Sequence, residues 1–243
     1  MIVLRSLTKE IRGSRELVIN NISAVFPRKC HVAIVGDRRS GKSALLRLIC
    51  GIDLPTSGQV ERDMSVSTPV GTPPRLSREF TLKQVLSFSA RVHSADIEEL
   101  TEFVAKAARL TGKLNHTLHD ISTSDLRRLY MVLGYAMPFD CYLFDEVLGN
   151  NQPEDTKLFH DLFLSRAATS ATILTTYSKR TLEQYSVVNP DYLVLESGRL
   201  FPCDSMAAAL RRIERTREQP VRGQAKARQD REMSLQSRRP GGF

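Results

Sequence analysis

The sequence has few cysteines and no long apolar run, and both shortages restrict what the protein can be. The cysteines are far apart, with no C-x-x-C motif and no Cys/His cluster, so we expect reduced core thiols and neither disulfides nor metal ligands. No apolar run approaches the roughly 18–20 residues that cross a bilayer, and residues 1–5 lack the layout of a signal peptide. These absences predict a soluble, cytoplasmic protein whose membrane role, if it has one, requires a partner. The four cysteines are Cys30, Cys50, Cys141 and Cys203.

Net charge is also small over most of the chain, although the formal net charge of the whole sequence is +8. Residues 211–243 contain ten Arg or Lys and four Asp or Glu, so a surplus of six positive charges lies in this segment. The segment has no aromatic residue before Phe243, whereas single-stranded nucleic acid is bound by basic residues with interleaved aromatics. We therefore expect a disordered basic tail over residues 211–243 and no nucleic-acid partner.

One motif indicates a phosphate-binding loop. Residues Gly36-Asp37-Arg38-Arg39-Ser40-Gly41-Lys42-Ser43 match G-x-x-x-x-G-K-S, and they follow the apolar run His31–Val35, which reads as a buried strand. Ala44 begins a segment with helical spacing. In such a loop the backbone N–H groups and the helix N-terminus face a polyphosphate. Lys42 is then expected to reach the β- and γ-phosphates, and Ser43 to hold Mg²⁺.

An accidental match in a glycine-containing turn is the alternative for this motif. It is disfavoured because the strand, the loop and the helix agree. The sequence thus predicts a nucleotide site, and we include Ala44 with residues 36–43 in the predicted binding set.

A second apolar run, Phe139–Glu146, ends in two carboxylates. Taken alone, it is best explained as a strand that stops at a solvated acidic turn. With a phosphate-binding loop upstream, Asp145 is predicted to bind Mg²⁺, and Glu146 to orient or deprotonate the attacking water.

The remaining pattern predicts an α/β fold with an antiparallel β layer at the N-terminus and an inserted α-helical subdomain. Apolar residues at three- and four-residue spacing favour helices between Phe80 and Leu114 and again from Leu126, whereas prolines between residues 68 and 80 indicate an extended loop. A basic helix is predicted beyond Ala207. Strands are predicted at 2–7, 17–26, 59–61 and 172–176, with a hairpin at 192–200 that turns at Ser197-Gly198.

Taken in order, these motifs resemble the ATP-binding subunit of ABC transporters over about residues 1–210, with the helical subdomain at about 80–135. The segment Leu45–Gly58 resembles that family's helix and turn after the phosphate-binding loop. A narrower resemblance, to the branch that exports capsular and other cell-surface polysaccharides, rests on four segments. These are Met1–Lys9, Val25-Phe26-Pro27, Gly51-Ile52-Asp53 and residues 139–148.

The resemblance implies a cytoplasmic subunit, peripheral on the inner face of the cell membrane, that drives a separate membrane-spanning permease. Two such subunits, as a homodimer or a heterodimer, would trap two ATP molecules with Mg²⁺ between the phosphate-binding loop of one and the signature loop of the other. Ser122 and Ser124 stand in the signature loop and are predicted to contact the partner's nucleotide. The long loop at residues 64–80 is expected near the permease.

The sequence departs from the family pattern at four places. Glu10-Ile11 replaces an aromatic that stacks on adenine. Ser124 replaces a glycine and Asp125 adds a negative charge beside the γ-phosphate, so both are expected to disfavour the closed dimer. Tyr177 replaces a histidine and cannot carry a positive charge. Arg38-Arg39 replaces small residues, and Arg39 would be strained if its position requires a positive φ.

We therefore expect the ATPase subunit of a polysaccharide exporter with intact nucleotide binding and weakened hydrolysis. The residues predicted to act in hydrolysis are Lys42, Glu146 and Tyr177. The alternative is a non-hydrolysing regulatory or scaffold subunit that pairs with an active ATPase.

Overall fold

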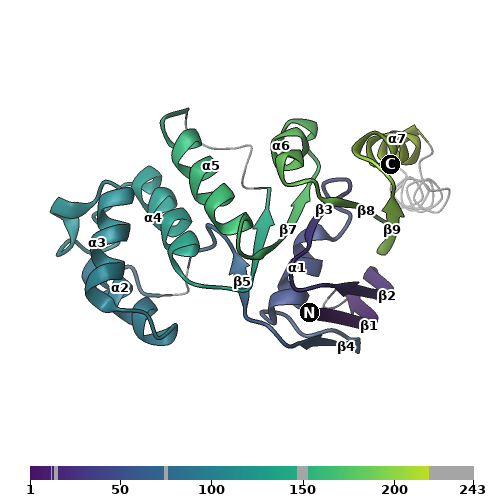
Figure 1. Cartoon of the computed structure of the whole chain (residues 1–243). Helices are drawn as coiled ribbons and strands as arrows, with labels where there is room; N and C mark the ends of the chain where they lie inside the picture. The colour runs from purple at the N-terminus through teal and green to yellow at the C-terminus, as the bar shows by residue number, and fades with distance from the viewer. Residues whose placement is uncertain (12, 14–15, 74–75, 147–152, 219–243) are drawn as a thin grey trace, which may run out of the picture.

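The computed structural model describes residues 1–11, 13, 16–73, 76–146 and 153–218 (Figure 1). An antiparallel sheet of order β2-β1-β4 is formed by β1 (Ile2–Glu10), β2 (Leu17–Phe26) and β4 (Ser57–Arg62). It confirms the predicted β layer at the N-terminus.

The central sheet has the order β5-β6-β7-β3-β8-β9 and is parallel except for the edge strand β9. The carboxyl ends of its parallel strands meet at one edge, where open α/β sheets bind ligands. Its strands are β3 (His31–Val35), β5 (Val66–Pro69), β6 (Cys141–Asp145), β7 (Ala171–Thr176), β8 (Asp191–Glu196) and β9 (Arg199–Cys203).

Helices cover both faces of the central sheet, which explains why its strands read as continuous apolar runs. α1 lies between the two sheets and buries Leu45, Leu46 and Ile49 against the β1–β2 layer and one face of the central sheet. The other face packs against the remaining helices in a second core. The helices are α1 (Lys42–Cys50), α2 (Leu82–Val92), α3 (Ile97–Ala107), α4 (Thr123–Ala136), α5 (Pro153–Ala167), α6 (Lys179–Tyr185) and α7 (Met206–Glu218), with short 3₁₀ turns at Thr111–Lys113 and Ser186–Val188.

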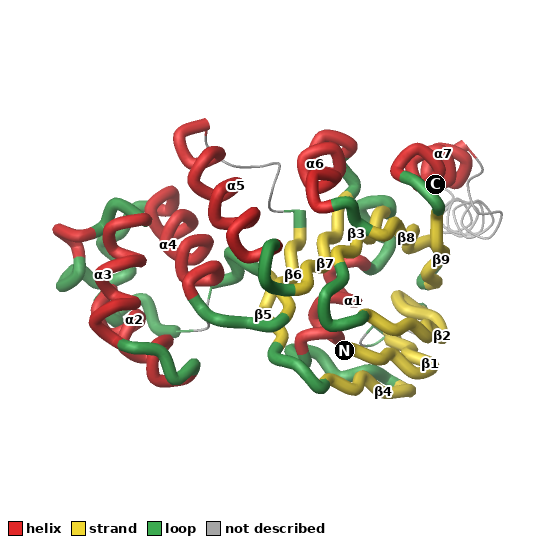
Figure 2. The backbone as a smooth tube through the Cα atoms, viewed as in Figure 1, coloured by secondary structure: helices red, strands yellow, loops and turns green. Residues whose placement is uncertain are grey.

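Three helices, α2, α3 and α4, stand together at one end of the molecule, apart from the yellow strands in Figure 2. We call them the helical layer. They confirm the helices predicted from residue 80 onward. In the parts of the chain that the structure describes, no helix combines the length and the apolar character needed to cross a bilayer.

The structure differs from the sequence-based expectation in three segments. Residues 66–69, within the loop predicted at 64–80, form β5, which pairs with β6, and the backbone N–H of Val70 continues this pairing by donating to Leu143. Helices α5 and α6 were not predicted. The basic helix beyond Ala207 is α7, which begins at Met206, and residues 219–243 of the predicted tail lie outside the described residues.

Candidate nucleotide-binding site

The loop between β3 and α1 depends on two glycines for different reasons. A Cβ on Gly36 would lie 2.6 Å from the Leu195 carbonyl oxygen and from Ser40 Oγ, so a side chain has no room. Gly41 has a φ of 98°, in the left-handed region, and a Cβ there would lie 2.8 Å from the Val18 carbonyl oxygen. Both glycines therefore keep the loop tight against its neighbours. Ser40 Oγ is buried against Gly36 without a hydrogen-bond partner.

Lys42 lies at the start of α1 and is only 4% exposed. Its Nζ donates hydrogen bonds to the carbonyl oxygens of Gly36, at 2.9 Å, and Asp37, at 2.6 Å. The loop thus holds a buried ammonium group within its own curve. Ser43, the next residue in the chain, is exposed.

The N-terminus of α1 is suited to an anion. Its N-cap residue, Gly41, has no side chain that accepts from the first turn, and the first turn contains no acidic residue. Backbone N–H groups at such an end attract phosphate, with help from the helix dipole. Together with Lys42, this cradle fits the phosphates of a nucleotide.

The expected strain at Arg39 is not observed. Positive φ values occur at seven of the described non-glycine residues, and Arg39 is not among them. The left-handed conformation is taken by Gly41 two positions later, so the loop accommodates Arg39 as an exposed side chain. The condition for strain at this arginine, a positive φ, is therefore not met.

Asp145 and Glu146 leave β6 beside the end of β7. Thr175 Oγ1 donates to Asp145 Oδ1 at 2.7 Å, and Thr176 Oγ1 donates to Glu146 Oε2 at 3.0 Å. The backbone N–H of Tyr177 donates to the other Glu146 carboxylate oxygen at 2.8 Å. Each predicted carboxylate is therefore oriented by the neighbouring strand.

Glu146 has an unusual backbone and electrostatic environment. Its φ of 58° is rare for a non-glycine residue and marks a site held by its surroundings. Burial raises the pKa of its carboxyl group, while the hydrogen bond from Thr176 and the charge of Lys42 act in the opposite direction. Lys42 is thus close enough to influence the carboxylate.

Tyr177 lies at the centre of these groups. Arg38 donates a hydrogen bond from a guanidinium nitrogen to the Tyr177 hydroxyl at 3.1 Å, and its Cζ lies 4.7 Å from the ring centroid. Lys42 Nζ lies 5.8 Å from the same centroid. The structure therefore brings together the loop Gly36–Ser43, the two carboxylates and Tyr177, although the loop is more than 100 residues from the other two in the sequence.

The signature segment lies at the start of α4, in the helical layer and away from α1 (Figure 1). Ser122 is the N-cap residue, and its Oγ accepts from the Asp125 N–H at 3.2 Å and lies 3.1 Å from Ser124 Oγ. Ser122 and Ser124 are both exposed, as a contact with another chain requires.

Asp125 does not present an uncompensated negative charge, contrary to the sequence-based expectation. Its carboxylate accepts from Lys113 at 2.8 Å and from Arg128 at 3.0 Å, and Arg128 also pairs with the buried Asp155 at 2.8 Å. The hydrogen bond with Lys113 is the main reason why the pKa of Asp125 lies below its usual value. Two acidic and two basic groups thus form a balanced cluster.

The residues present also fit a magnesium ion. Mg²⁺ is commonly held by one or two carboxylates together with substrate phosphates and water. Asp145, which is partly exposed, and the Ser43 hydroxyl group would supply the protein ligands. The described residues contain no group of three or more His, Cys, Asp or Glu that could hold a metal without such help.

The sequence analysis did not predict the residues that orient the two carboxylates. Thr175 and Thr176 were predicted only as strand residues, although two threonines at the end of an apolar strand could have indicated side chains that donate to the site. The cluster of Lys113, Arg128 and Asp155 had no sequence signal, because its members come from three separate elements.

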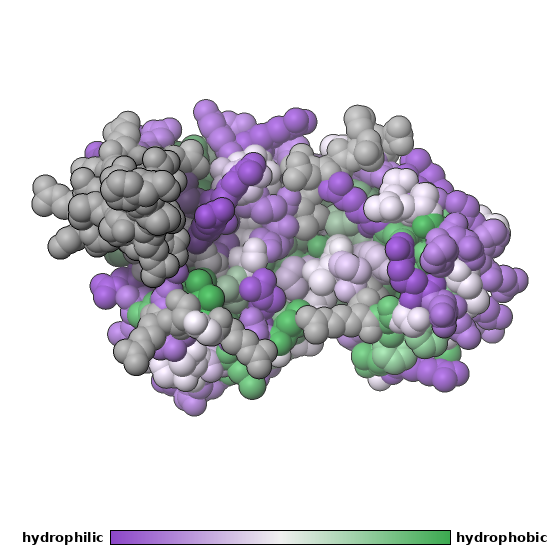
Figure 3. Space-filling view, turned by 180° about the vertical axis from the view of Figure 1, so that it is seen from behind, coloured by the Kyte–Doolittle hydropathy of each residue, from purple (hydrophilic) through white to green (hydrophobic). Residues whose placement is uncertain are grey.

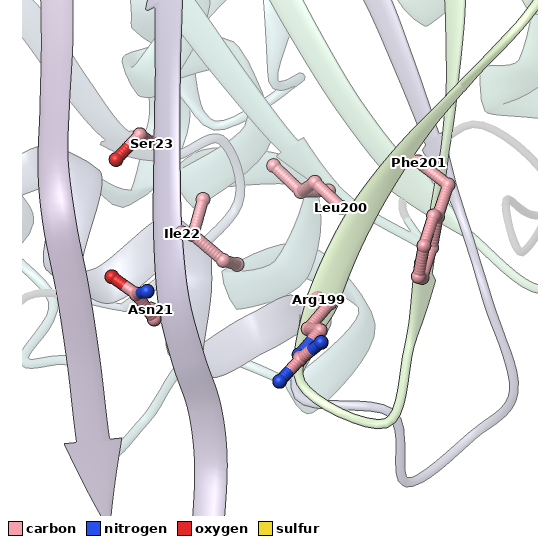
Figure 4. Close-up of a pocket in the computed structure, with 6 residues that line it drawn as sticks. All are labelled: Asn21, Ile22, Ser23, Arg199, Leu200 and Phe201. Carbon is pink, nitrogen blue, oxygen red and sulfur yellow. The ribbon is translucent and has the colours of Figure 1, made fainter.

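A hollow elsewhere on the surface is separate from these residues. It has a volume of about 330 Å³ and lies between β2 and β9 (Figure 4). Ile22 and Leu200 face each other across it, while Asn21 and Ser23 point to the other side of β2. None of the predicted site residues lines it.

The fold and this loop define the chain as a P-loop nucleotide-binding domain with the architecture of ABC ATPases. The sequence model of the ABC transporter family matches residues 19–149, more than half of the chain, and the chain therefore belongs to this family. ATP is the nucleotide that this family binds.

Two relatives are similar in both length and sequence. The polysialic acid transport ATP-binding protein KpsT of Escherichia coli is 31% identical over 189 residues, covering 76% of this chain and 86% of that protein. The capsule polysaccharide export ATP-binding protein CtrD of Neisseria meningitidis serogroup B is 31% identical over 194 residues, with coverage of 79% and 88%.

Solved structures agree on the fold. An ATP-binding subunit of an ABC transporter superposes with a TM-score of 0.70 at 19% identity, over 84% of this chain and 90% of that one. The dimeric ABC transporter cassette MJ0796 gives a TM-score of 0.66 at 16% identity, over 82% and 96%.

Proposed function

We propose that this chain is the ATP-binding subunit of an ABC exporter for capsular or other cell-surface polysaccharide. It couples the binding and hydrolysis of ATP to a separate membrane-spanning permease. The observation that carries the proposal is the assembly of the loop Gly36–Ser43, with its buried Lys42, beside the two carboxylates at the end of β6. The relatives named for polysaccharide transport support the substrate class.

Each site residue has a proposed role that its position supports. The loop N–H groups and Lys42 bind the phosphates, and Ser43 and Asp145 hold Mg²⁺, which neutralises phosphate charge when bound. Glu146, clamped between Thr176 and the Tyr177 backbone, orients the attacking water.

Hydrolysis is proposed to be slow relative to nucleotide binding. In the first turn of α4, the Asp125 N–H already donates to the Ser122 hydroxyl oxygen. Ser124 also carries a Cβ at the position where the resemblance implies a close approach of the backbone. Tyr177 supplies a hydroxyl group but no charge. The comparisons do not favour a non-hydrolysing scaffold, and the carboxylate of Glu146 is present and oriented.

Exposed apolar side chains support a contact between the helical layer and the permease. Phe80 ends the loop expected near the permease and is 42% exposed, while Phe88 and Val92 on α2 are 51% and 58% exposed. From behind, hydrophobic surface gathers over the lower end of this layer, at the lower right of Figure 3. We propose this surface, with residues 64–80, as the permease contact.

Nucleotide binding is tested by titration calorimetry of the full chain with MgATP. We expect binding below millimolar nucleotide and its loss in Lys42→Ala, because Lys42 supplies the buried ammonium group. Lys157→Ala is the matched control, since this lysine side chain is 91% exposed on α5. Equal binding by the wild type and Lys42→Ala would contradict the assignment of the site.

The transport role is tested by disrupting the gene in its own host. We expect polysaccharide to accumulate inside the cell and to fall at the surface, with restoration by the wild-type gene and not by Lys42→Ala. Unchanged surface polysaccharide, with nucleotide binding intact in vitro, would reject the substrate class and leave the ATPase assignment in place.

A further inference from the structure

Arg38 makes two contacts with Tyr177 that its place on an exposed loop does not require. Its guanidinium group both stacks over Tyr177, with Cζ 4.7 Å from the ring centroid, and donates to the phenol oxygen at 3.1 Å. An exposed arginine that only interacts with water needs neither contact. Stacking on an aromatic face and the hydrogen bond to the phenol both favour this position of the guanidinium group.

The position of Arg38 is defined relative to the phosphate-binding lysine. Lys42 Nζ lies 5.8 Å from the same Tyr177 centroid, so both cationic groups contact one ring. In a P-loop the lysine reaches the β- and γ-phosphates. Arg38 is therefore held at the same end of the loop as this lysine.

Tyr177 also connects Arg38 with the carboxylate side of the site. Its backbone N–H donates to Glu146 at 2.8 Å, while its side chain contacts Arg38. A water molecule oriented by Glu146 has to lie next to the terminal phosphate that it attacks. A terminal phosphate bound by Lys42 and attacked by that water would therefore lie beside the ring that Arg38 contacts.

We propose that Arg38, seated on Tyr177, is the residue that makes the site prefer a nucleoside triphosphate over a diphosphate, by facing the terminal phosphate with its guanidinium group. This inference rests on the proposed function and deepens it. Tyr177 acts through Arg38 as a positioning residue. A planar, positively charged guanidinium group has several N–H donors that match phosphate oxygens. A phenol has one donor and no positive charge.

The test compares MgATP and MgADP affinities of the full chain by calorimetry. Because a hydrogen bond to a charged group is worth about 1.5–3 kcal/mol, Arg38→Ala is expected to weaken MgATP about tenfold to a hundredfold. MgADP affinity is expected to stay within about twofold, since the diphosphate lacks the group that Arg38 faces. The ATP preference therefore falls.

Another arginine provides a matched comparison. Arg180→Ala removes an exposed charge on α6, three residues after Tyr177, and is expected to leave both affinities unchanged. If Arg180→Ala lowers the ATP preference as much as Arg38→Ala, general surface charge explains the effect and the proposal fails.

The role of Tyr177 is measured with a double-mutant cycle. Tyr177→Ala removes the seat of Arg38 but keeps the backbone N–H that holds Glu146, so it should lower the ATP preference. The double variant with Arg38→Ala should lower it no further, because both changes remove one interaction. Additive losses would show that the two residues act separately and would overturn the positioning role. Circular dichroism of each variant checks that it is folded, and Arg38→Gln repeats the comparison if Arg38→Ala is not.

The calorimetry distinguishes a failure of the proposed function from a failure of the role of Arg38. A wild-type chain that binds neither nucleotide rejects the proposed function itself. A chain that binds MgATP and MgADP equally, or in which Arg38→Ala weakens both alike, keeps the proposed function and rejects the role of Arg38.

Discussion

The starts of α1 and α4 were both predicted to contact a triphosphate, yet they are built differently. α1 begins at a left-handed glycine with no side-chain cap and no acid in its first turn, beside the buried ammonium group of Lys42. α4 begins at Ser122, which caps the Asp125 N–H, and its charges are paired within the chain. The first end is open to an anion, whereas the second is largely satisfied by its own side chains.

This difference supports the proposal that the chain keeps nucleotide binding while the dimer closes weakly around a partner's nucleotide. The donors at the α1 end have no competing side-chain acceptor at the N-cap. At the α4 end, the Ser122 hydroxyl group competes for a backbone donor. We therefore attribute the proposed weakness to satisfied hydrogen bonds and not to the charge of Asp125, which is balanced.

The largest expected effect on stability comes from breaking the charge cluster at the start of α4, formed by Lys113, Asp125, Arg128 and Asp155. Arg128→Ala leaves Asp155, which is 4% exposed, without its ion-pair partner. Removing one member of a buried pair costs about 3–5 kcal/mol in the free energy of unfolding, which urea denaturation measures. The exposed pair of Lys157 with Asp161 provides the control, and Lys157→Ala should change the free energy by less than about 1 kcal/mol. Similar losses in the two variants would refute the buried cluster.

At the α1 end, Gly41→Ala is expected to cost about 1–3 kcal/mol in stability. The substitution places a Cβ at a φ of 98° and 2.8 Å from the Val18 carbonyl oxygen. Thermal unfolding measures the loss, and calorimetry should show weaker MgATP binding. Gly112→Ala is the matched control, because a Cβ there meets nothing within 4 Å. Equal melting temperatures for the two variants would argue against the loop geometry.

Removing the cap of α4 should have a smaller effect. Ser122→Ala loses the acceptor of the Asp125 N–H and is expected to lower the free energy of unfolding by about 1 kcal/mol. MgATP affinity of the single chain should not change, since this end does not face the chain's own loop. Thr123→Ala, at the next and equally exposed position, serves as the control. A loss of MgATP affinity in Ser122→Ala alone would contradict the separation of the two ends.

The smallest effect is a pH dependence that originates at Asp125. Its folded pKa is lowered, first by the hydrogen bond with Lys113, so its contribution to stability is present above the unfolded value of about 3.9 and is lost as the pH falls through the folded pKa. We expect Asp125→Asn to reduce the dependence of stability on pH in this acidic range by less than about 1 kcal/mol. Urea unfolding between pH 2 and 5 measures it, with Asp161→Asn, at an exposed pair, as the control. A steeper dependence in Asp125→Asn would reverse the assigned sign.

Local sequence determined much of the fold. β3 runs from His31 to Val35 as predicted, and the hairpin of β8 and β9 turns at Ser197 and Gly198, whose φ values of 49° and 74° suit a two-residue turn. These features depend on neighbours in the chain, so a pattern of apolar and turn residues suffices. β5 and the helices α5 and α6 were missed because their apolar signals are short and their stability comes from packing on distant strands.

By itself, the sequence determined that this chain carries a phosphate-binding loop, a carboxylate pair and the order of elements in between, because these are properties of contiguous residues. Only the tertiary structure decided how they work together. It placed Arg38 on Tyr177, oriented Asp145 and Glu146 through β7, and neutralised Asp125. Each of these is a contact between residues far apart in the chain, where distance and burial set the strength of an interaction and the residue types alone do not.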